Sequence, residues 1–284
     1  MIITAFKGGL GNQLFQYAAA RKFAYAGQTE LKLDFRNYAK VMHELKIRCF
    51  NIEENVATEQ ECDRLTRKDV LYYLEKTLPY YKRRFVWERN WMFDQNLVGI
   101  KRKNMYVRGT FQSPKYFDGI ETILRKELTP KESVDKKYRD IIDVINGTNS
   151  VSIHIRRGDM MAESTGRHVV TPSYYTSAVE YIKQRVKDPR FFVFSDDIPW
   201  VKENLAFTEH MEFVSRPGIH DYEELLIMAK CKSNIIGDST FSWWGAWLDT
   251  NLDKIVICPE KWLTDPEMNA AYTQNLLPES WVRL

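Results

Sequence analysis

The amino-acid sequence predicts an α/β fold with parallel sheets, divided into two domains. The first observation is the regular alternation of short apolar strands and amphipathic helices from about residue 150 to residue 258. The second is the same strand–helix–strand order over residues 2–35. Parallel strands need a long crossover, usually a helix, so both patterns favour parallel sheets with helices on both faces. The expected domains are residues 1–145 and 146–284.

The first domain begins with a clear strand–helix–strand pattern and then becomes harder to interpret. Its expected elements are a strand at 2–6, a helix at 12–26, strands at 30–35 and 105–111, and a helix near 115–127. Residues 36–104 show polar helical pieces that are interrupted at Pro79. Pro130 and the charged residues after it are expected to form a surface connection.

The second domain is the more regular of the two. Its expected elements are strands at 151–155, 191–194, 211–214, 233–236 and 254–258, and helices at 173–186, 199–205, 222–231 and 241–249. Residues 221–224 (DYEE) predict a capping box at the start of the helix at 222–231. Trp243, Trp244 and Trp247 follow at near-helical spacing and are expected in the core.

Composition excludes several classes of protein. With 41 Lys or Arg against 38 Asp or Glu, the net charge of +3 is too small for a typical nucleic-acid-binding protein. No apolar run is long enough to span a membrane, and residues 1–4 lead into a strand rather than a signal peptide, so a cytoplasmic protein is expected. The four cysteines lack metal-ligand spacing, and neither an HExxH nor a DxD motif is present, so no metal is expected.

A glycine-rich turn joins the first strand to the first helix. Gly9 and Gly11 belong to the stretch KGGLGNQLFQ, and such a turn before a helix can bind phosphate. Leu14 replaces the third glycine of the dinucleotide fingerprint GxGxxG, although Asp34 supplies the acidic end of the second strand. Asn12 places an amide at the helix start. This stretch alone leaves a nicotinamide-dependent oxidoreductase, a different ligand site and a simple chain reversal open.

The stretch SVSIHIRRGDM, residues 150–160, carries the stronger functional signal. It alternates like a strand and ends in Arg156 and Arg157, where ligands of open parallel sheets bind. Two adjacent guanidinium groups suit phosphate oxygens, because each presents a planar fork of donors. His154 precedes them, and Asp159 is expected to brace one arginine. A surface ion pair is the alternative interpretation.

Two further strand ends bring polar groups to the same edge. Asp196 and Asp197 follow the strand at 191–194, where a carboxylate can accept the two N–H groups of guanine or bind ribose hydroxyls, while one of the pair is expected to cap the next helix. Ser239, Thr240 and Ser242 lie at a helix N-terminus, where hydroxyls and backbone amides can bind phosphate.

Four of these stretches occur together and in order: GGLGNQLFQY at 8–17, HIRRGD at 154–159, SDD at 195–197 and DSTFSWW at 238–244. Together they resemble the bacterial α-1,2-fucosyltransferases of glycosyltransferase family 11. The resemblance covers nearly the whole chain and is weakest over 36–104. It implies a GT-B fold, with two Rossmann-like domains facing a cleft and the donor GDP-fucose held mainly by the C-terminal domain.

The resemblance also implies roles for individual residues. Arg156 is expected to bind the pyrophosphate of GDP, and the glycine loop to close over the donor from the N-terminal side. The other expected donor-binding residues are His154, Arg157, Asp196, Asp197, Ser239, Thr240 and Ser242 in the second domain, and Gly9, Gly11 and Asn12 in the first.

The implied reaction is attack by a galactose 2-hydroxyl on GDP-β-L-fucose, which forms an α-linkage with inversion. The catalytic candidates are Arg156, which would neutralise the departing GDP in place of a metal, Asp159 and Glu163. Glu163, in the loop 160–166, is the candidate general base; a solvated loop carboxylate is the alternative. The expected acceptor is a galactose-terminated oligosaccharide, either free or lipid-linked.

Two rival functions and one ambiguous segment stay open. The rivals are a nicotinamide-dependent oxidoreductase and a non-catalytic nucleotide- or glycan-binding module. The ambiguous segment, residues 72–94, is rich in Tyr, Trp, Arg and Lys. It is expected to shape an acceptor site, to touch an anionic membrane surface from the cytoplasmic side, or to cover the N-terminal core as an amphipathic helical pair.

Overall fold

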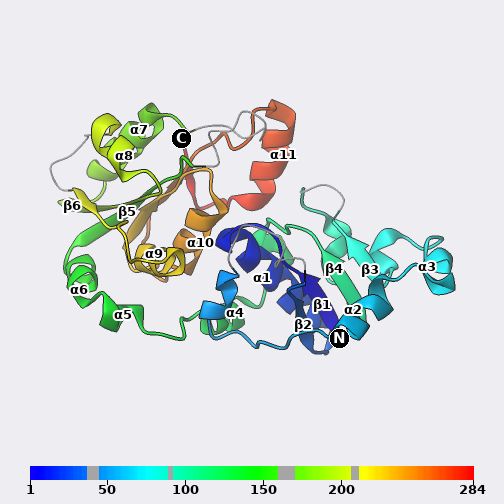
Figure 1. Cartoon of the computed structure of the whole chain (residues 1–284). Coiled ribbons are helices and arrows are strands. Elements are labelled where there is room, and N and C mark those ends of the chain that lie inside the picture. Colours follow the sequence, from blue (N-terminus) through cyan, green and yellow to red (C-terminus); the bar gives the residue numbers. More distant parts are fainter. Residues whose placement is uncertain (37–44, 89–91, 159–169, 206–210) are drawn as a thin grey trace. The chain divides into compact units, whose positions relative to one another are not determined.

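The computed structural model of the chain describes residues 1–36, 45–88, 92–158, 170–205 and 211–284 (Figure 1). The chain divides into two compact units, Met1–Lys131 and Glu132–Leu284. The division falls before the residues 132–145 that the sequence assigned to the first domain. Each unit contains one parallel sheet, so the predicted α/β class is confirmed.

The first unit is built on four parallel strands in the order β2-β1-β4-β3. Its strands are β1 (Ile2–Ala5), β2 (Leu31–Asp34), β3 (Phe85–Trp87) and β4 (Met105–Arg108). Its helices are α1 (Leu10–Gly27), α2 (Glu59–Thr66), α3 (Val70–Glu75) and α4 (Glu121–Glu127), with short 3-10 turns η2 (Lys46–Cys49), η3 (Tyr80–Lys82), η4 (Gln95–Leu97) and η5 (Pro114–Tyr116). The helix expected near 115–127 is interrupted where Gly119 takes a positive φ of 82°.

The second unit has six parallel strands in the order β10-β9-β8-β5-β6-β7. Its strands are β5 (Asn149–Ile155), β6 (Pro189–Ser195), β7 (Met211–Phe213), β8 (Ser233–Ile235), β9 (Val256–Cys258) and β10 (Val282–Arg283). Its helices are α5 (Val134–Lys137), α6 (Arg139–Gly147), α7 (Pro172–Lys183), α8 (Ile198–Asn204), α9 (Asp221–Met228), α10 (Thr240–Leu248) and α11 (Pro266–Leu276).

Two local predictions for the second unit are wrong. The expected surface connection after Pro130 contains α5 and α6, because Ile141, Ile142 and Ile145 form a buried helical face. The expected capping box at residues 221–224 is displaced by one residue. The backbone N–H of His220 donates to Glu223, so the cap begins at His220.

The core of the second unit lies where the central strands meet their covering helices. Val151, Ile153 and Ile155 of β5 pack with residues of β6, α7 and β8. Trp243 and Trp244 are fully buried, as the sequence predicted, and the Trp243 indole donates to the Leu276 carbonyl at 3.0 Å. Among the described residues, no helix is long and apolar enough to cross a membrane.

The glycine turn of the first unit is held by side-chain amides. Gly8 has a φ of 78°, and Gln13 donates to its carbonyl at 3.2 Å. Gln16 bonds both the N–H and the C=O of Lys7, at 3.0 and 3.2 Å. Because both glutamines are buried, these bonds keep the turn in one conformation.

Substitution of the two adjacent glycines should have unequal effects on stability. A Cβ at Gly8 would combine a left-handed backbone with a contact of 2.5 Å to the Asn12 amide, so Gly8→Ala should lower the unfolding free energy by about 2 kcal/mol. Gly9 has a φ of −69°, and a Cβ at this position would meet no atom within 4 Å apart from its chain neighbours. Gly9→Ala is therefore the matched control and should cost less than about 1 kcal/mol. Equal losses in urea unfolding would contradict this account.

Candidate functional site

The strand order of the second sheet places a switch point between β5 and β8. The chain proceeds from β5 to β6 and β7 on one side, and from β8 to β9 and β10 on the other. Ligands of doubly wound sheets bind outside the carboxyl ends of the strands at such a point. Here β5 is followed by Arg156, and β8 by Gly237, Asp238 and the start of α10. The arginine pair and the hydroxyl-rich helix start predicted from the sequence therefore follow neighbouring strands.

The pairing of β5 with β6 determines which charged groups meet. The two strands are in parallel register from Asn149↔Pro189 to Ile155↔Ser195. The next two residues on each strand are therefore opposite one another. Arg156 pairs with Asp196 at 3.3 Å, and Arg157 pairs with Asp197 at 3.3 Å. The Arg156 side chain is 37% exposed, so its charge is accessible to solvent despite this pairing.

Asp196 also fixes the backbone after β5. Its two carboxylate oxygens accept the N–H groups of Arg157 at 2.9 Å and Gly158 at 3.0 Å. A Cβ at Gly158 would lie 2.7 Å from Asp196 Oδ2, so only glycine permits this approach. Asp196 thus braces Arg156 and also holds the backbone after β5.

Asp197 and Arg157 both contact Trp200 in the first turn of the next helix, α8. Asp197 accepts the N–H of Trp200 at 3.1 Å as the N-cap of α8, which confirms the predicted capping role for one of the two aspartates. The Arg157 guanidinium carbon lies 3.6 Å from the centroid of the Trp200 ring. Stacking and ion pairing both restrain Arg157. Trp200 was not identified from the sequence as a contact of Arg157. Its position three residues after the capping Asp197 could have suggested a side chain near the end of the strand.

His154 is buried in β5, two residues before Arg156. Burial, reinforced by the positive charge of Arg156, lowers its pKa from 6.5 to about 3. Its Nδ1 has no hydrogen-bond partner among the described residues. Its ring centroid lies 5.3 Å from that of Phe241, and its backbone carbonyl accepts from the Tyr175 hydroxyl at 3.3 Å. The imidazole is therefore neutral at physiological pH.

The start of α10 supplies the hydroxyl groups. Ser239 is the N-cap, and its hydroxyl accepts the N–H of Phe241 at 3.3 Å. Ser242 is completely buried and donates to the Ser239 carbonyl at 3.2 Å, while Thr240 is nearly buried. Ser239 is the most exposed of the three. The helix has nine residues, so its N-terminal amides add positive potential at this edge.

In the first unit, two residues that follow the glycine turn are hydrogen-bonded to distant segments of the same unit. Asn12 accepts from the Gln112 amide at 2.6 Å. Gln13 accepts the N–H groups of Lys46 and Ile47 at 3.1 and 3.0 Å. Gly9 is the N-cap of α1, and Gly11 lies in its first turn.

Asp34 does not present a free carboxylate for a ribose. It is buried, accepts from the Tyr106 hydroxyl at 2.7 Å and pairs with Arg36 at 3.1 Å. Although burial alone would raise the pKa of Asp34, these hydrogen bonds hold it below its usual value. The acidic residue needed by the nicotinamide alternative is therefore already bonded within the protein.

Two catalytic candidates fall outside the described residues. Asp159 and Glu163 stay predictions from the sequence. Within the described ranges, no group of three or more His, Cys, Asp or Glu side chains is arranged to hold a metal ion.

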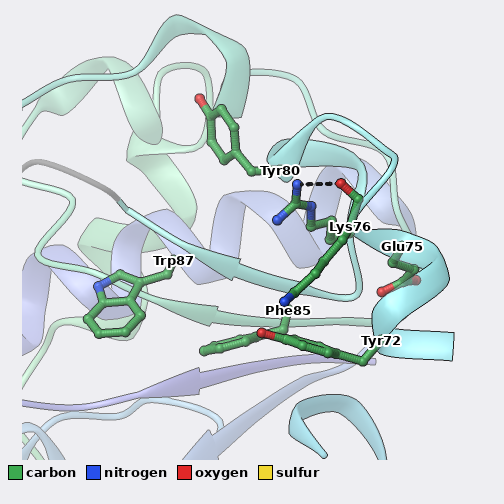
Figure 2. Close-up of a pocket in the computed structure, with 7 residues that line it drawn as sticks. Tyr72, Glu75, Lys76, Tyr80, Phe85 and Trp87 are labelled. Carbon is green, nitrogen blue, oxygen red and sulfur yellow. Dashed lines mark hydrogen bonds between the residues drawn. The ribbon is translucent and has the colours of Figure 1, made fainter. Parts of the chain in front are cut away.

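The aromatic and basic segment at residues 72–94 borders a pocket of about 390 Å³ (Figure 2). Figure 2 shows Tyr72 and Phe85 near one another, Lys76 extending toward them, and Trp87 on another side. Phe85 packs against the core of the first unit. Trp87, in contrast, is mostly exposed, so the interpretation as a cover for the core is wrong for this side chain.

The sequence model of the family described as Glycosyl transferase family 11 matches residues 1–284. The chain belongs to glycosyltransferase family 11.

Relatives of this family 11 chain include bacterial and animal enzymes. An alpha-1,2-colitosyltransferase from Escherichia coli is 31% identical over 293 residues, covering 100% of this chain and 99% of the relative. A galactoside 2-alpha-L-fucosyltransferase from Caenorhabditis elegans is 29% identical over 187 residues, covering 61% of this chain and 51% of the relative.

Solved structures establish the fold type of this family 11 protein. The α-1,6-fucosyltransferase NodZ from Bradyrhizobium, soaked with GDP-fucose, superposes with a TM-score of 0.53 at 13% identity. The match covers 87% of this chain and 91% of NodZ. The fold is of the GT-B type, with two Rossmann-like units, as predicted.

The buried imidazole makes stability depend on pH. Below pH 6.5 the unfolded chain binds a proton at His154, whereas the folded chain does so only near pH 3. The unfolding free energy should therefore fall as pH falls, by up to about 1.4 kcal/mol per unit between about pH 6 and pH 4 from this group. Urea unfolding of His154→Gln should show a slope reduced by about that amount. A slope equal to that of the parent would contradict the assignment.

Proposed function

We propose that this family 11 glycosyltransferase moves L-fucose from GDP-β-L-fucose to the 2-hydroxyl of a terminal β-galactoside, forming an α-1,2 linkage with inversion. The observation that carries the proposal is the position of Arg156 at the switch point, beside the strand that leads to α10. The C. elegans relative, whose name states this activity, supports the linkage.

The proposed mechanism is electrostatic. In an oxocarbenium-like transition state, negative charge gathers on the departing diphosphate. Arg156 offers two parallel N–H donors to that charge, and the N-terminus of α10 adds its amide dipoles. Donors fixed before the reaction stabilise such charge by a few kcal/mol, because they need little reorganisation.

The other groups are assigned supporting roles. His154, being neutral, would contact the nucleoside without adding charge. Asp196 holds the Arg156–Gly158 backbone, which sets the direction of the guanidinium. Arg157 is proposed as a second hydrogen-bond donor to the nucleotide. Ser239 is proposed as the hydroxyl that reaches the nucleotide, since it is the most exposed of the three hydroxyl residues. Asn12 and its glycine turn are proposed to contact the donor from the first unit.

One specific observation favours a second candidate for the transferred sugar. The E. coli relative that matches the whole chain is named for colitosyl transfer, also with α-1,2 linkage. A colitosyl donor therefore stands beside fucosyl as the second candidate. For the acceptor, we propose a galactose-terminated oligosaccharide, with a lipid-linked glycan as its membrane-borne form.

The main test of the mechanism is the substitution Arg156→Lys. Lysine keeps the charge but loses the planar fork, so the fold should persist while kcat falls roughly a hundredfold or more. Arg190→Lys is the matched control, because Arg190 lies at the start of β6 and pairs with Glu212 at 2.9 Å. Initial rates at saturating GDP-fucose measure both. A kcat near that of the parent in Arg156→Lys would refute the role.

The identity of the donor is tested by a direct screen. Calorimetry with GDP, GDP-fucose, GDP-colitose, UDP and NADH, followed by transfer to lactose and linkage analysis of the product, should show GDP-dependent binding and an α-1,2 product. Since Arg156 is proposed to neutralise the leaving group, the same rates are expected with EDTA present. Transfer from GDP-colitose alone would select the second candidate. GDP binding without transfer would favour a binding module, and binding of NADH alone an oxidoreductase.

A further inference from the structure

Helix α3 buries a charged side chain and exposes its apolar ones, which is the opposite of an ordinary surface helix. Its buried residue is Glu75, which is only 7% exposed, whereas Leu71 and Leu74 are 51% and 62% exposed. Glu75 accepts the N–H of Arg84 at 3.0 Å and pairs with Arg102 at 2.9 Å. Asp69 is the N-cap of α3: its carboxylate accepts the N–H of Tyr72 and pairs with Arg84. Polar contacts therefore attach α3 to the first unit, and its apolar side chains face solvent.

Exposed apolar side chains lie on α3, just after it and on β3. We call this group the α3 surface and define it by six exposed side chains: Val70, Leu71, Tyr73, Leu74, Leu78 and Trp87. Figure 1 shows α3 beyond β3, the edge strand of the first sheet. Concentrated exposed apolar side chains of this kind mark a surface that binds a partner or a membrane.

Positively charged side chains contact aromatic rings at and beside the α3 surface. The Lys76 ammonium lies 5.3 Å from the Tyr72 ring centroid and 5.1 Å from that of Tyr73, and Arg108 lies 5.1 Å from the Trp87 ring. Residues 64–108 contain 12 Lys or Arg and 4 Asp or Glu, whereas the rest of the chain contains 29 and 34. The small net charge of the protein thus conceals a strongly basic region next to exposed aliphatic groups.

We propose that the α3 surface binds the headgroup region of an anionic phospholipid bilayer. Leucines and aromatic rings enter the headgroup–acyl boundary, while lysines and arginines remain at the phosphates. Protein interfaces, in contrast, are depleted in lysine at their core. The pocket beside the surface carries the Lys76 ammonium next to the Tyr72 ring, which suits a phosphate group (Figure 2). Glu75 also lines this pocket, and its carboxylate is paired with Arg102. This inference does not depend on which sugar is transferred.

The test is co-sedimentation of the full chain with vesicles of phosphatidylcholine alone or of phosphatidylcholine with phosphatidylglycerol. The parent should bind the anionic vesicles, more weakly as salt rises, and should not bind neutral vesicles. The double variant Leu71→Ser/Leu74→Ser should bind about tenfold more weakly. Leu252→Ser is the matched control, because Leu252 is 98% exposed in the second unit and should leave binding unchanged.

Charge variants test the second component of the same surface. Lys82 is an exposed lysine at the end of η3, within the basic region 64–108. Lys76→Gln and Lys82→Gln should each weaken binding about fivefold. Lys232→Gln should not, because Lys232 is an exposed lysine of the second unit. Circular dichroism and thermal unfolding check that every variant is folded, and transfer to soluble lactose reports separately on the proposed function. Equal binding to neutral vesicles, or unchanged binding by the double variant, would overturn the proposal. So would self-association that the double variant abolishes, because the occupant would then be a second copy of the chain.

Discussion

The parallel register of β5 on β6 is the constraint on which the candidate site depends. Because Ile155 lies opposite Ser195, the next residues of the two strands must face one another as two Arg–Asp pairs. A shift of one residue would exchange these partners and turn every side chain of β5 to the other face of the sheet. The buried bond from Ser152 to Asn234, 2.7 Å long, ties β5 to β8 on its other side. Packing inside the sheet thus determines the geometry of charges at its edge.

The two units use their strand ends in different ways. In the second unit, the groups that follow β5 are charged and partly exposed. In the first unit, the corresponding turn is closed by buried amides, and Glu88 after β3 is buried and accepts the N–H groups of Thr110 and Phe111. Burial raises the pKa of Glu88, against the lowering effect of these bonds. The carboxylate that follows β3 is therefore bonded within the first unit, whereas the guanidinium of Arg156, which follows β5, is partly exposed.

Much of the fold followed from local patterns, and the remainder depends on long-range packing. The alternation of Val151, Ile153 and Ile155 was sufficient to predict β5 and the positions of the arginines at its end. Strand order was not predictable, since no local period reports which strands pair, so the switch point and the Asp196 partner came only from the structure. The edge strand β3 has three residues, which are too few for the alternation of apolar and polar side chains to be recognised within a charged segment. Helix α11, with its weak amphipathic pattern, was missed for a similar reason.

The pairing of Arg156 with Asp196 has a consequence for turnover. A diphosphate that binds Arg156, as proposed, competes for the guanidinium with the carboxylate of Asp196, which lies 3.3 Å away. Such an intramolecular competitor lowers the affinity of Arg156 for every anion by the same factor, including the GDP product. Product would then leave faster, at the cost of a higher donor concentration for half-saturation. By this competition Asp196 would help to set the rate of the catalytic cycle.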